Sequence, residues 1–553
     1  MQKIYYFMNV FLLYNLFMLN MKVRTKDLDR DTTNTISVAS RLVNLLEEMN
    51  VDTVFGYPGA AVLPIYNSLS ESKIRHVLCR HEQGAVHAAE GYAKVKNRAG
   101  VVLVTSGPGF TNTITGILNA YSDKTPLVII SGQVQKLNNN EFQSVDIENM
   151  AKTCTKAVYE IKDPNEIDQV IKRAFHVAQE IPKGPVIVTV SKTVSESMIK
   201  DFQPYKIKKE IKVEAPHSCV LKAIETLRNA NRPVIIAGGG CTGIENELSE
   251  FSHLTHIPVV NTLMGKGIAD DISLGLIGQS GEKSLNDFIQ KADVVLALGV
   301  RFTNRTTDNA EDFLPNSKII SINIERNTSD NVQLEKEFIG ELEVILQQMI
   351  GTIKAKNILF DIKYDWLESI PQNSFGNKKY IAETDRIISL IYEYSKKYHP
   401  IITTDVGEHQ ISVAKIFKTS SPRKFLTSGG FGTMGFGLPS AVGGYFASPN
   451  SLILNITGDG SFQMNMQELG TVSEHNIPVK IFIINNSSLG MIETTQISKY
   501  NKKYQSSLIN PDFKKIAESY GIQAYSVRGE YQLEKTLKEI FKYKKAVLVD
   551  IKI

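Results

Sequence analysis

The sequence has few cysteines, and they show no pairing. Its four cysteines are scattered along 553 residues, at Cys79, Cys154, Cys219 and Cys241. A disulfide framework or a zinc site needs closer, repeated spacings. The scarcity therefore excludes a small secreted scaffold that disulfides stabilise. It favours thiols in a reducing compartment, and we expect a cytoplasmic protein.

An excess of charge of one sign is also missing. The chain has 62 basic and 58 acidic side chains, which gives a formal net charge of +4. This balance, without a basic stripe interleaved with aromatic residues, argues against a nucleic-acid partner. The lysine-rich run at residues 206–212 is interpreted as a solvated surface.

No apolar run is long enough to span a membrane. Residues 4–19 are largely apolar but are interrupted by Asn9 and Asn15, and a membrane span needs about twenty apolar residues. No small-residue cleavage site follows, as a signal peptide would require. Residues 1–34 are therefore interpreted as a disordered leader, or as the product of a start upstream of a true start at Met21.

The chain is too long for one hydrophobic core, and no internal repeat is visible. Short runs rich in valine and isoleucine alternate with helical patterns, which is typical of parallel sheets flanked by helices. We expect an α/β protein with three doubly wound domains in series, at residues 35–200, 215–350 and 376–553. Charged stretches at 200–216 and 354–379 are predicted to be linkers, the second holding the only tryptophan, Trp366.

The strongest chemical signal lies in the last third. Gly-Asp-Gly-Ser at residues 458–461 closes an apolar run, and 27 positions after Asp459 a second apolar run ends in Asn485-Asn486. One β-α-β crossover brings Asp459 and Asn486 to the same edge of a parallel sheet, where such sheets bind ligands. Carboxylate and amide oxygens suit Mg²⁺, and Gly460 lets the backbone approach a phosphate. A plain Asp-Gly turn would explain the first half of this pattern but not the second.

This pattern resembles the signature of thiamine-diphosphate enzymes. The resemblance implies that Asp459 and Asn486 hold Mg²⁺, with the main-chain carbonyl of Ser488 as a further ligand. It also implies that the bound thiamine diphosphate contacts Gly460, Ser461 and Met491.

A second motif supplies a candidate catalytic acid. Arg80-His81-Glu82-Gln83-Gly84 precedes a predicted helix, where an isolated glutamate would ordinarily be read as N-terminal charge capping. In the family that the chain resembles, this glutamate shares a proton with the pyrimidine ring of the cofactor and so activates it. Such a carboxyl works best where burial raises its pKa. The resemblance implies that Glu82 has this role.

Two more segments resemble parts of the cofactor site. Residues 404–410 resemble the turn that contacts the diphosphate, and this assigns Gly407, Glu408 and His409. Glu408 departs from the usual glutamine, and an acid there repels a diphosphate unless only its backbone faces the anion. Residues 428–439 resemble the segment that bends the cofactor, with Met434 between its rings and the Gly432 carbonyl as an acceptor.

Within this class, residues 36–553 resemble the acetolactate synthase catalytic subunits. The matching segments are 54–63, 80–93, 106–113, 131–134, 142–143 and 299–305. The resemblance implies a pyrimidine-binding, a central FAD-binding-like and a diphosphate-binding domain. It implies decarboxylation of pyruvate and transfer of the two-carbon unit to a second 2-keto acid, giving 2-acetolactate in branched-chain amino acid biosynthesis. A homodimer or dimer of dimers is expected, in which Glu82 reaches the cofactor of another subunit, and a small regulatory subunit can accompany the family.

The same resemblance assigns substrate and flavin contacts. Arg305 matches the arginine that binds the acceptor's carboxylate, for which a guanidinium is suited. The other matched positions divide into substrate residues (Phe110, Gln143 and Lys192) and contacts of a structural, non-redox FAD (Gly238, Gly239, Gly240 and Arg301). Thr303-Asn304 and Pro182 stand where the family has other flavin-contacting residues.

The identity of the acceptor stays open at this point. Thr495 replaces a tryptophan that favours 2-ketobutyrate, which enlarges the acceptor pocket, and the chain ends at Ile553, before the family's usual closing segment. An alternative is therefore transfer of the two-carbon unit to a bulkier carbonyl, such as a nucleotide-linked keto-sugar. A non-catalytic scaffold would be expected to lose Glu82 or the metal ligands, and neither is lost.

Overall fold

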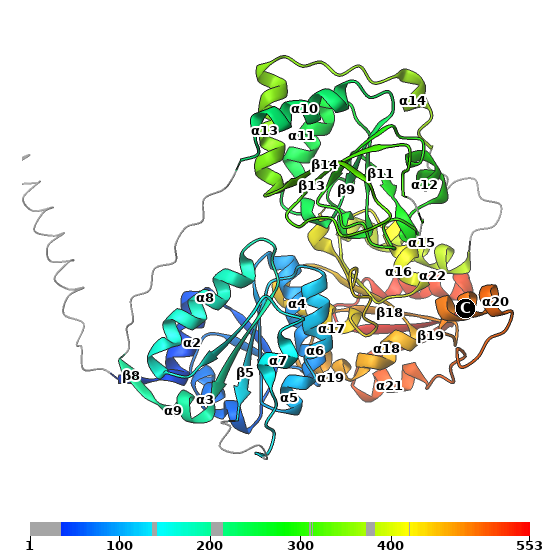
Figure 1. The fold of residues 1–553 in the computed structure, drawn as a ribbon. Helices are drawn as coiled ribbons and strands as arrows, with labels where there is room; N and C mark the ends of the chain where they lie inside the picture. Colours follow the sequence, from blue (N-terminus) through cyan, green and yellow to red (C-terminus); the bar gives the residue numbers. More distant parts are fainter. Residues whose placement is uncertain are drawn as a thin grey trace, which may run out of the picture.

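The computed structural model describes residues 35–134, 141–200, 214–308, 311, 313–371, 382–419 and 421–553, and the predicted leader lies outside these ranges. The described residues form three six-stranded sheets and one two-stranded sheet, and all strand pairs within the six-stranded sheets are parallel. The N-terminal and C-terminal units lie side by side, and the middle unit sits above their junction (Figure 1). The predicted class, three serial α/β domains with parallel sheets, is confirmed.

The N-terminal sheet follows the order β3-β2-β4-β5-β7-β6. Its strands are β2 (Thr53–Tyr57), β3 (Arg75–Leu78), β4 (Gly100–Val104), β5 (Leu127–Gln133), β6 (Ala157–Ile161) and β7 (Pro185–Ser191). Its helices are α2 (Val38–Glu48), α3 (Leu63–Ser70), α4 (Glu82–Lys96), α5 (Pro108–Thr111), α6 (Ile114–Ser122), α7 (Ile147–Ala151), α8 (Ile167–Gln179) and α9 (Lys192–Glu196). The short antiparallel pair β1 (Thr35–Ser37) and β8 (Met198–Lys200) brings the two ends of this unit together.

The middle sheet follows the order β11-β10-β9-β12-β13-β14. Its strands are β9 (Pro233–Ala237), β10 (Val259–Asn261), β11 (Ser273–Leu276), β12 (Val294–Leu298), β13 (Lys318–Asn323) and β14 (Leu334–Ile339). Its helices are α10 (His217–Arg228), α11 (Glu245–Thr255), α12 (Lys283–Ile289), α13 (Leu342–Ala355) and α14 (Tyr364–Glu368).

The predicted linker at 354–379 is wrong around its tryptophan. Trp366 lies in α14 and is buried, and its ring stacks on Phe288 with a centroid distance of 4.1 Å. Its indole N–H donates to the Pro233 carbonyl at 3.0 Å. A lone tryptophan in a polar stretch gives no sign of its partner, which lies far away in the sequence. Trp366 therefore belongs to the core of the middle unit.

The C-terminal sheet follows the order β16-β15-β17-β18-β20-β19. Its strands are β15 (Ile401–Thr404), β16 (Phe425–Thr427), β17 (Ile453–Gly458), β18 (Lys480–Asn485), β19 (Gln523–Arg528) and β20 (Val547–Lys552). Its helices are α15 (Glu383–Ser395), α16 (Glu408–Ile416), α17 (Gly437–Ala447), α18 (Asp459–Asn465), α19 (Leu469–Glu474), α20 (Gly490–Tyr500), α21 (Phe513–Ser519) and α22 (Gly529–Ile540).

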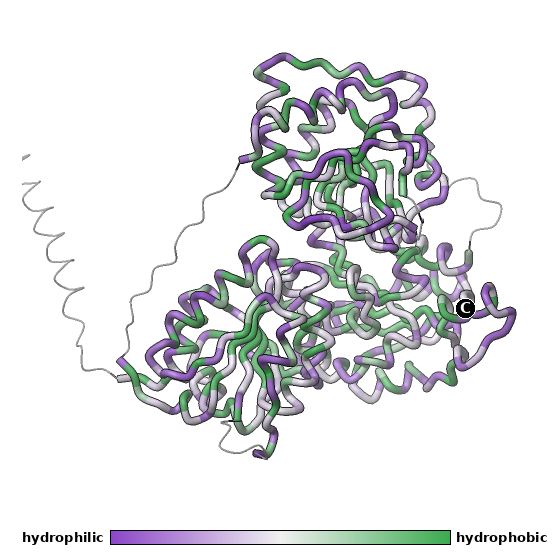
Figure 2. The backbone as a smooth tube through the Cα atoms, in the orientation of Figure 1, coloured by the Kyte–Doolittle hydropathy of each residue, from purple (hydrophilic) through white to green (hydrophobic). Residues whose placement is uncertain are grey.

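Apolar residues gather on the strands of all three sheets (Figure 2), as expected for parallel sheets covered on both faces. One core cluster runs across the N-terminal and C-terminal units and includes Phe55, Phe110 and Phe436. Among the described residues, no helix is long and apolar enough to cross a membrane.

Helices α4 and α17 form the junction between the first and last units (Figure 1). Small residues allow their backbones to come close. A Cβ placed at Gly443 would lie 1.8 Å from the Ala88 carbonyl oxygen, and one at Gly91 would lie 2.3 Å from that of Ser440. Since no side chain fits there, glycine is required at both positions. This contact fixes the first and last units relative to each other.

Candidate cofactor site

The predicted metal motif lies at the carboxyl edge of the C-terminal sheet. Strands β17 and β18 are parallel neighbours, with Gly458 opposite Ile484. Asp459 follows the first strand directly, and Asn486 follows the second. The prediction that these two segments meet at one edge of the sheet is confirmed. The helix expected after Asp459 is interrupted, because a 3₁₀ turn at Met466–Glu468 separates α18 from α19.

The Asp459 carboxylate is buried and held by residues that the sequence reasoning did not single out. Asn510 donates its side-chain N–H to Asp459 Oδ2 at 2.6 Å and to Asn485 Oδ1 at 2.9 Å. Burial raises the pKa of the Asp459 carboxyl, and the hydrogen bond from Asn510 opposes this shift. A partly desolvated carboxylate gains from a nearby cation, because the cation offsets the cost of burying its charge.

The loop after β18 is folded around Asn486. The Asn486 side-chain oxygen accepts from the Ser488 backbone N–H at 3.0 Å. The Ser488 hydroxyl donates to Glu493 at 2.7 Å, which joins the loop to the first turn of α20. The backbone N–H of Ser487 is a hydrogen-bond donor to the Asp459 carboxyl. The loop that carries Asn486 and Ser488 therefore contacts Asp459 directly.

His409 contributes an unpaired buried nitrogen. Its Nε2 atom is buried and meets no hydrogen-bond partner among the residues that the structure describes. Burial lowers the pKa of His409 to about 4, so the ring is neutral near pH 7. Its ring lies against Gly407 and Gly458, where a Cβ would come within 2.6 Å and 3.1 Å of ring atoms. An unsatisfied buried polar group costs free energy, and a bound ligand with a complementary hydrogen-bonding group would satisfy it.

Gly407 and Glu408 begin α16 next to this ring. Gly407 has a φ of 153°, a conformation that favours glycine. The Glu408 side chain is exposed, and its carboxyl lies near Gly490, where a Cβ would be 3.3 Å from the Glu408 Cδ. The carboxyl thus extends toward the loop after β18, and the N-terminus of α16 beside it favours an anion.

The segment predicted to bend the cofactor reaches the same place. Gly432 has a φ of +78°, and a Cβ built on it would meet nothing within 4 Å. A Cβ at Gly460 would lie 3.7 Å from the Met434 methyl carbon, so Met434 lies next to the metal motif. Ser461 donates its hydroxyl to the Val406 carbonyl at 3.3 Å. Met491 lies on α20, which has no buried residue.

Glu82 begins α4 in the N-terminal unit. Its carboxylate accepts from the Asn112 side-chain N–H at 2.9 Å. Among the contacts of the described residues, no hydrogen bond joins Glu82 to Asp459 or to the loop after β18. Within a single chain, the predicted catalytic acid Glu82 and the predicted metal site at Asp459 therefore make separate sets of hydrogen bonds.

A buried acid, Glu468, positions the segment before Glu82, and the sequence reasoning missed it. Glu468 accepts from the Arg80 backbone N–H at 2.9 Å, and a Cβ at Gly84 would lie 2.3 Å from its Oε1 atom. Burial raises the pKa of the Glu468 carboxyl. In the sequence, only the glycine at position 84 hints at a close neighbour there, and it does not indicate that the neighbour is Glu468.

The predicted flavin contacts line a cleft of about 320 Å³ between the three units. Gly239, Gly240, Arg301, Arg305 and Pro182 all line it. Gly238 does not: it is buried, and a Cβ there would lie 2.3 Å from the Gly299 carbonyl oxygen. Arg305 Nη1 and Arg423 Nε are buried without a hydrogen-bond partner in the described part of the chain. Both side chains face the cleft, and burial lowers the pKa of Arg305.

The other predicted substrate residues are not gathered around Arg305. Phe110 is fully buried in the core that spans the first and last units. Gln143 lies beside Gly107, where a Cβ would be 2.7 Å from the Gln143 Cβ. Lys192 is exposed and pairs with Glu196 at 3.8 Å. None of the three lines the cleft that contains Arg305.

Three family models match the chain, one for each unit. Residues 36–151 match the thiamine pyrophosphate enzyme, N-terminal TPP binding domain. Residues 220–349 match the central domain of the same enzymes, and residues 405–551 match the C-terminal TPP binding domain. The chain therefore belongs to the thiamine pyrophosphate enzymes and depends on this cofactor.

Its similar relatives define the branch of the family. A probable acetolactate synthase large subunit of Methanocaldococcus jannaschii is 38% identical, over 93% of this chain and 91% of that protein. The acetolactate synthase large subunit of Haemophilus influenzae is 36% identical over 94% of both chains. The isozyme 2 large subunit of Escherichia coli is 35% identical over 90% of this chain and 92% of its own. Within the class, this chain belongs to the acetolactate synthase large subunits.

Proposed function

We propose that this chain is the catalytic subunit of an acetolactate synthase, which decarboxylates pyruvate and joins the two-carbon unit to a second 2-keto acid to give 2-acetolactate. The observation that carries the proposal is the set of contacts that brings Asp459, the loop after β18, His409 and Met434 together around the start of α18. Bound thiamine diphosphate supplies a carbon that becomes nucleophilic and takes up the two-carbon unit. The relatives favour this reading over transfer to a nucleotide-linked keto-sugar.

The oxygen donors of these residues fit Mg²⁺ with a diphosphate. The Asp459 carboxylate, the Asn486 side-chain oxygen and the Ser488 carbonyl would be its protein ligands, and all three are hard oxygen donors. The unpaired His409 Nε2 and the first turn of α16 would face the diphosphate, with Gly460 and Ser461 at the start of α18. Met434 would hold the bend, and Gly432 and Met491 would contact the rings.

The cleft between the three units fits a structural, non-redox FAD. Two unpaired buried arginine nitrogens, from Arg305 and Arg423, face it together with Arg301. Cationic groups of this kind suit a dinucleotide's phosphates, and Gly239 and Gly240 leave backbone exposed to the cleft. Gly238 is better explained by its packing on Gly299. We also propose that Arg305, which lines this cleft, takes the acceptor's carboxylate.

We also propose a homodimer, or a dimer of dimers, in which Glu82 of one subunit completes the cofactor site of another. The separate contacts of Glu82 and Asp459 within one chain support this arrangement. Helix α20 and the segment after it expose apolar residues that a partner subunit would cover. These are Ile492, Ile497, Tyr500, Tyr504 and Ile509. Phe110, Gln143 and Lys192 would then act on the substrate from the same subunit as Glu82.

The proposed function also assigns domain bounds, a partner subunit, a compartment and a pathway. We place the functional domains at residues 35–200, 215–350 and 376–553. The relatives are named large subunits, which supports a small regulatory partner subunit. The four cysteines form no disulfide, which supports a reducing compartment such as the cytoplasm. The pathway would be branched-chain amino acid biosynthesis.

Calorimetric titration tests the cofactor site. We expect the purified protein to bind thiamine diphosphate in the presence of Mg²⁺ and far more weakly in the presence of a chelator. Asp459→Ala should remove the dependence on Mg²⁺ and weaken binding by roughly a hundredfold. Asp361→Ala, at an exposed acid of the middle unit, is the control. Equal binding by Asp459→Ala and the wild type would contradict the assignment. The visible spectrum of the same sample reports bound flavin.

A further inference from the structure

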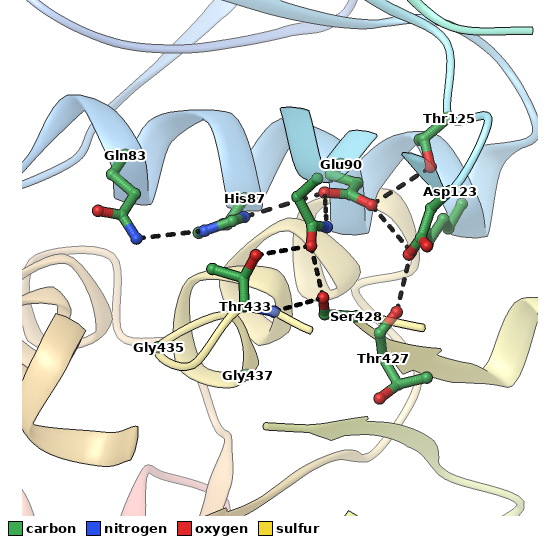
Figure 3. Close-up of polar contacts among 12 residues, drawn as sticks. Gln83, His87, Glu90, Asp123, Thr125, Thr427, Ser428, Thr433, Gly435 and Gly437 are labelled. Carbon is green, nitrogen blue, oxygen red and sulfur yellow. Dashed lines mark hydrogen bonds and ion pairs between the residues drawn. The ribbon is translucent and has the colours of Figure 1, made fainter. Parts of the chain in front are cut away.

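The segment after β16, residues 427–433, is held from the N-terminal unit. The Lys94 ammonium donates to the Thr427 carbonyl at 3.1 Å. Asp123 accepts from the Gly430 backbone N–H at 2.7 Å. Figure 3 shows helix α4 lying along this segment, with polar side chains between the two. The segment immediately precedes Met434, so whatever holds it also sets where Met434 lies.

Asn119 of α6 joins the two ends of this segment. Its side-chain oxygen accepts the hydroxyls of Ser428 at 2.5 Å and Thr433 at 2.8 Å. The Thr433 backbone N–H donates to Ser428 Oγ at 2.8 Å, so the Ser428 hydroxyl is free to donate to Asn119. One buried amide oxygen therefore closes the glycine-rich turn between residues 428 and 433.

Glu90 of α4 decides which way the Asn119 amide points. The Asn119 N–H donates to Glu90 Oε2 at 2.8 Å, and both side chains are fully buried. Burial alone would raise the pKa of the Glu90 carboxyl, but the contacts with Lys94, 2.9 Å away, and with His87 together outweigh burial and lower the pKa to about 2. An ionised Glu90 accepts only. The Asn119 N–H must therefore face Glu90, and its oxygen must face the two hydroxyls.

We propose that Asn119, oriented by Glu90, is a positioning residue for the cofactor: it holds the 428–433 turn, and with it Gly432 and Met434, in the conformation that the bound cofactor needs. The proposal rests on the proposed function, because that function places thiamine diphosphate against Met434. The cofactor is bound by the C-terminal unit, whereas the pair that sets the turn belongs to the N-terminal unit of the same chain.

Exchanging the amide of Asn119 and the carboxylate of Glu90 tests whether this pair holds the turn. In Asn119→Asp, the new carboxylate faces the Glu90 carboxylate, and in Glu90→Gln an amide N–H faces either the Asn119 N–H or Lys94. Each single change leaves a mismatch in the buried contact. In the double variant, the amide introduced at position 90 can donate to the carboxylate introduced at position 119. Its oxygen still accepts from Lys94 and Thr125, which lie 2.9 Å and 3.3 Å from Glu90 Oε1.

Two readouts are needed, and the first uses no cofactor. Amide hydrogen exchange of residues 428–434 in the cofactor-free protein should speed up by about tenfold in each single variant. Calorimetry should show thiamine diphosphate binding weakened by about tenfold with Mg²⁺ present, because fewer molecules hold the competent turn. The double variant should return both values to within about threefold of the wild type. Thr115→Ala, at an exposed site on α6, is the matched control.

The outcomes separate the two proposals. Single variants with wild-type exchange and affinity would overturn the positioning role. So would a double variant as defective as the singles, since the loss would then reflect general packing. A wild type that binds no thiamine diphosphate would overturn the proposed function, while the exchange data would still decide whether Asn119 and Glu90 hold the turn.

Discussion

At the scale of single residues, the two central acids differ in their surroundings. Asp459 is buried and hydrogen bonded by Asn510, whereas Glu82 is only partly buried and hydrogen bonded by Asn112. We assign metal binding to the first and activation of the cofactor to the second. Each role depends on a carboxyl oxygen, but only the role of Glu82 depends on a proton that can be shared. A change from acid to amide therefore affects the two positions differently.

Glu82→Gln should abolish turnover and leave cofactor binding largely intact. The amide keeps a similar shape and can still contact Asn112, but it cannot share a proton with the cofactor. We expect pyruvate consumption to fall by at least about a hundredfold, with thiamine diphosphate affinity within a few fold of the wild type. Glu71→Gln, at an exposed site after α3, is the control. An active Glu82→Gln enzyme would contradict the role of this residue.

His76 should make the fold sensitive to mild acid. Burial lowers its pKa to about 4 from the ordinary value of 6.5, and its ring nitrogen lies 2.9 Å from the Tyr66 hydroxyl. Between these two pKa values the unfolded chain binds more protons than the folded one. Stability from this group is therefore complete above about pH 6.5 and is lost as the pH falls toward 4.

Urea unfolding at several pH values measures this effect. We expect the unfolding midpoint of the wild type to decrease between pH 6.5 and pH 4.5, and His76→Gln to show a shallower decrease. The exposed His253→Gln is the control. A His76→Gln protein with the same pH profile as the wild type would show that His76 does not titrate in this way.

At the scale of elements, the contact between α4 and α17 depends on glycine. Gly443→Ala would place a methyl group 1.8 Å from the Ala88 carbonyl oxygen, and the helices would have to move apart. We expect a loss of about 3 kcal/mol in the free energy of unfolding. At the neighbouring Gly444, a Cβ meets only Leu426 and Ile401, at 3.5 Å and 3.6 Å.

Gly444→Ala is therefore a matched control on the same helix. It should leave stability unchanged or raise it by about 0.5–1 kcal/mol, because alanine favours a helix more than glycine does. Thermal unfolding of both variants makes the comparison. Equal stability of the two would mean that the helices tolerate a wider spacing than the close contact indicates.

The parts of the site that lie on consecutive strands could be predicted from the sequence. Asp459 and Asn486 follow consecutive strands of one crossover, so their meeting could be predicted from the strand pattern alone. Asn510, Glu468 and Asn119 could not be predicted, because each acts on a segment distant in the sequence and burial decides its role. The same reason explains why the sequence predicts a linker around Trp366, whose partners Phe288 and Pro233 are distant along the chain. The glycine run at 238–240 predicts three flavin contacts, but only Gly239 and Gly240 line the cleft, whereas Gly238 packs against Gly299.

At the scale of the whole molecule, the proposed dimer makes a prediction about mixed subunits. Glu82→Gln and Asp459→Ala subunits should each be inactive alone. If Glu82 of one subunit serves the Asp459 site of another, a mixed dimer contains one site with both native residues. Denaturing and refolding the two variants together should then restore up to about a quarter of the wild-type activity, because about half the dimers are mixed and each has one intact site.

Mixing each variant with itself is the control for this experiment. A mixture that stays inactive, although mass spectrometry shows mixed dimers, would place Glu82 and Asp459 in the same subunit's site. It would leave thiamine dependence untouched and would overturn only the arrangement of subunits.

Product identification from ¹³C-labelled pyruvate tests the central claim most directly. The purified chain, supplied with thiamine diphosphate and Mg²⁺, should convert the label into carbon dioxide and 2-acetolactate, as seen by nuclear magnetic resonance and mass spectrometry. A nucleotide-linked keto-sugar in the same sample should not divert the two-carbon unit. Pyruvate consumption without acetolactate, or transfer of the label to the sugar in preference to pyruvate, would contradict the account.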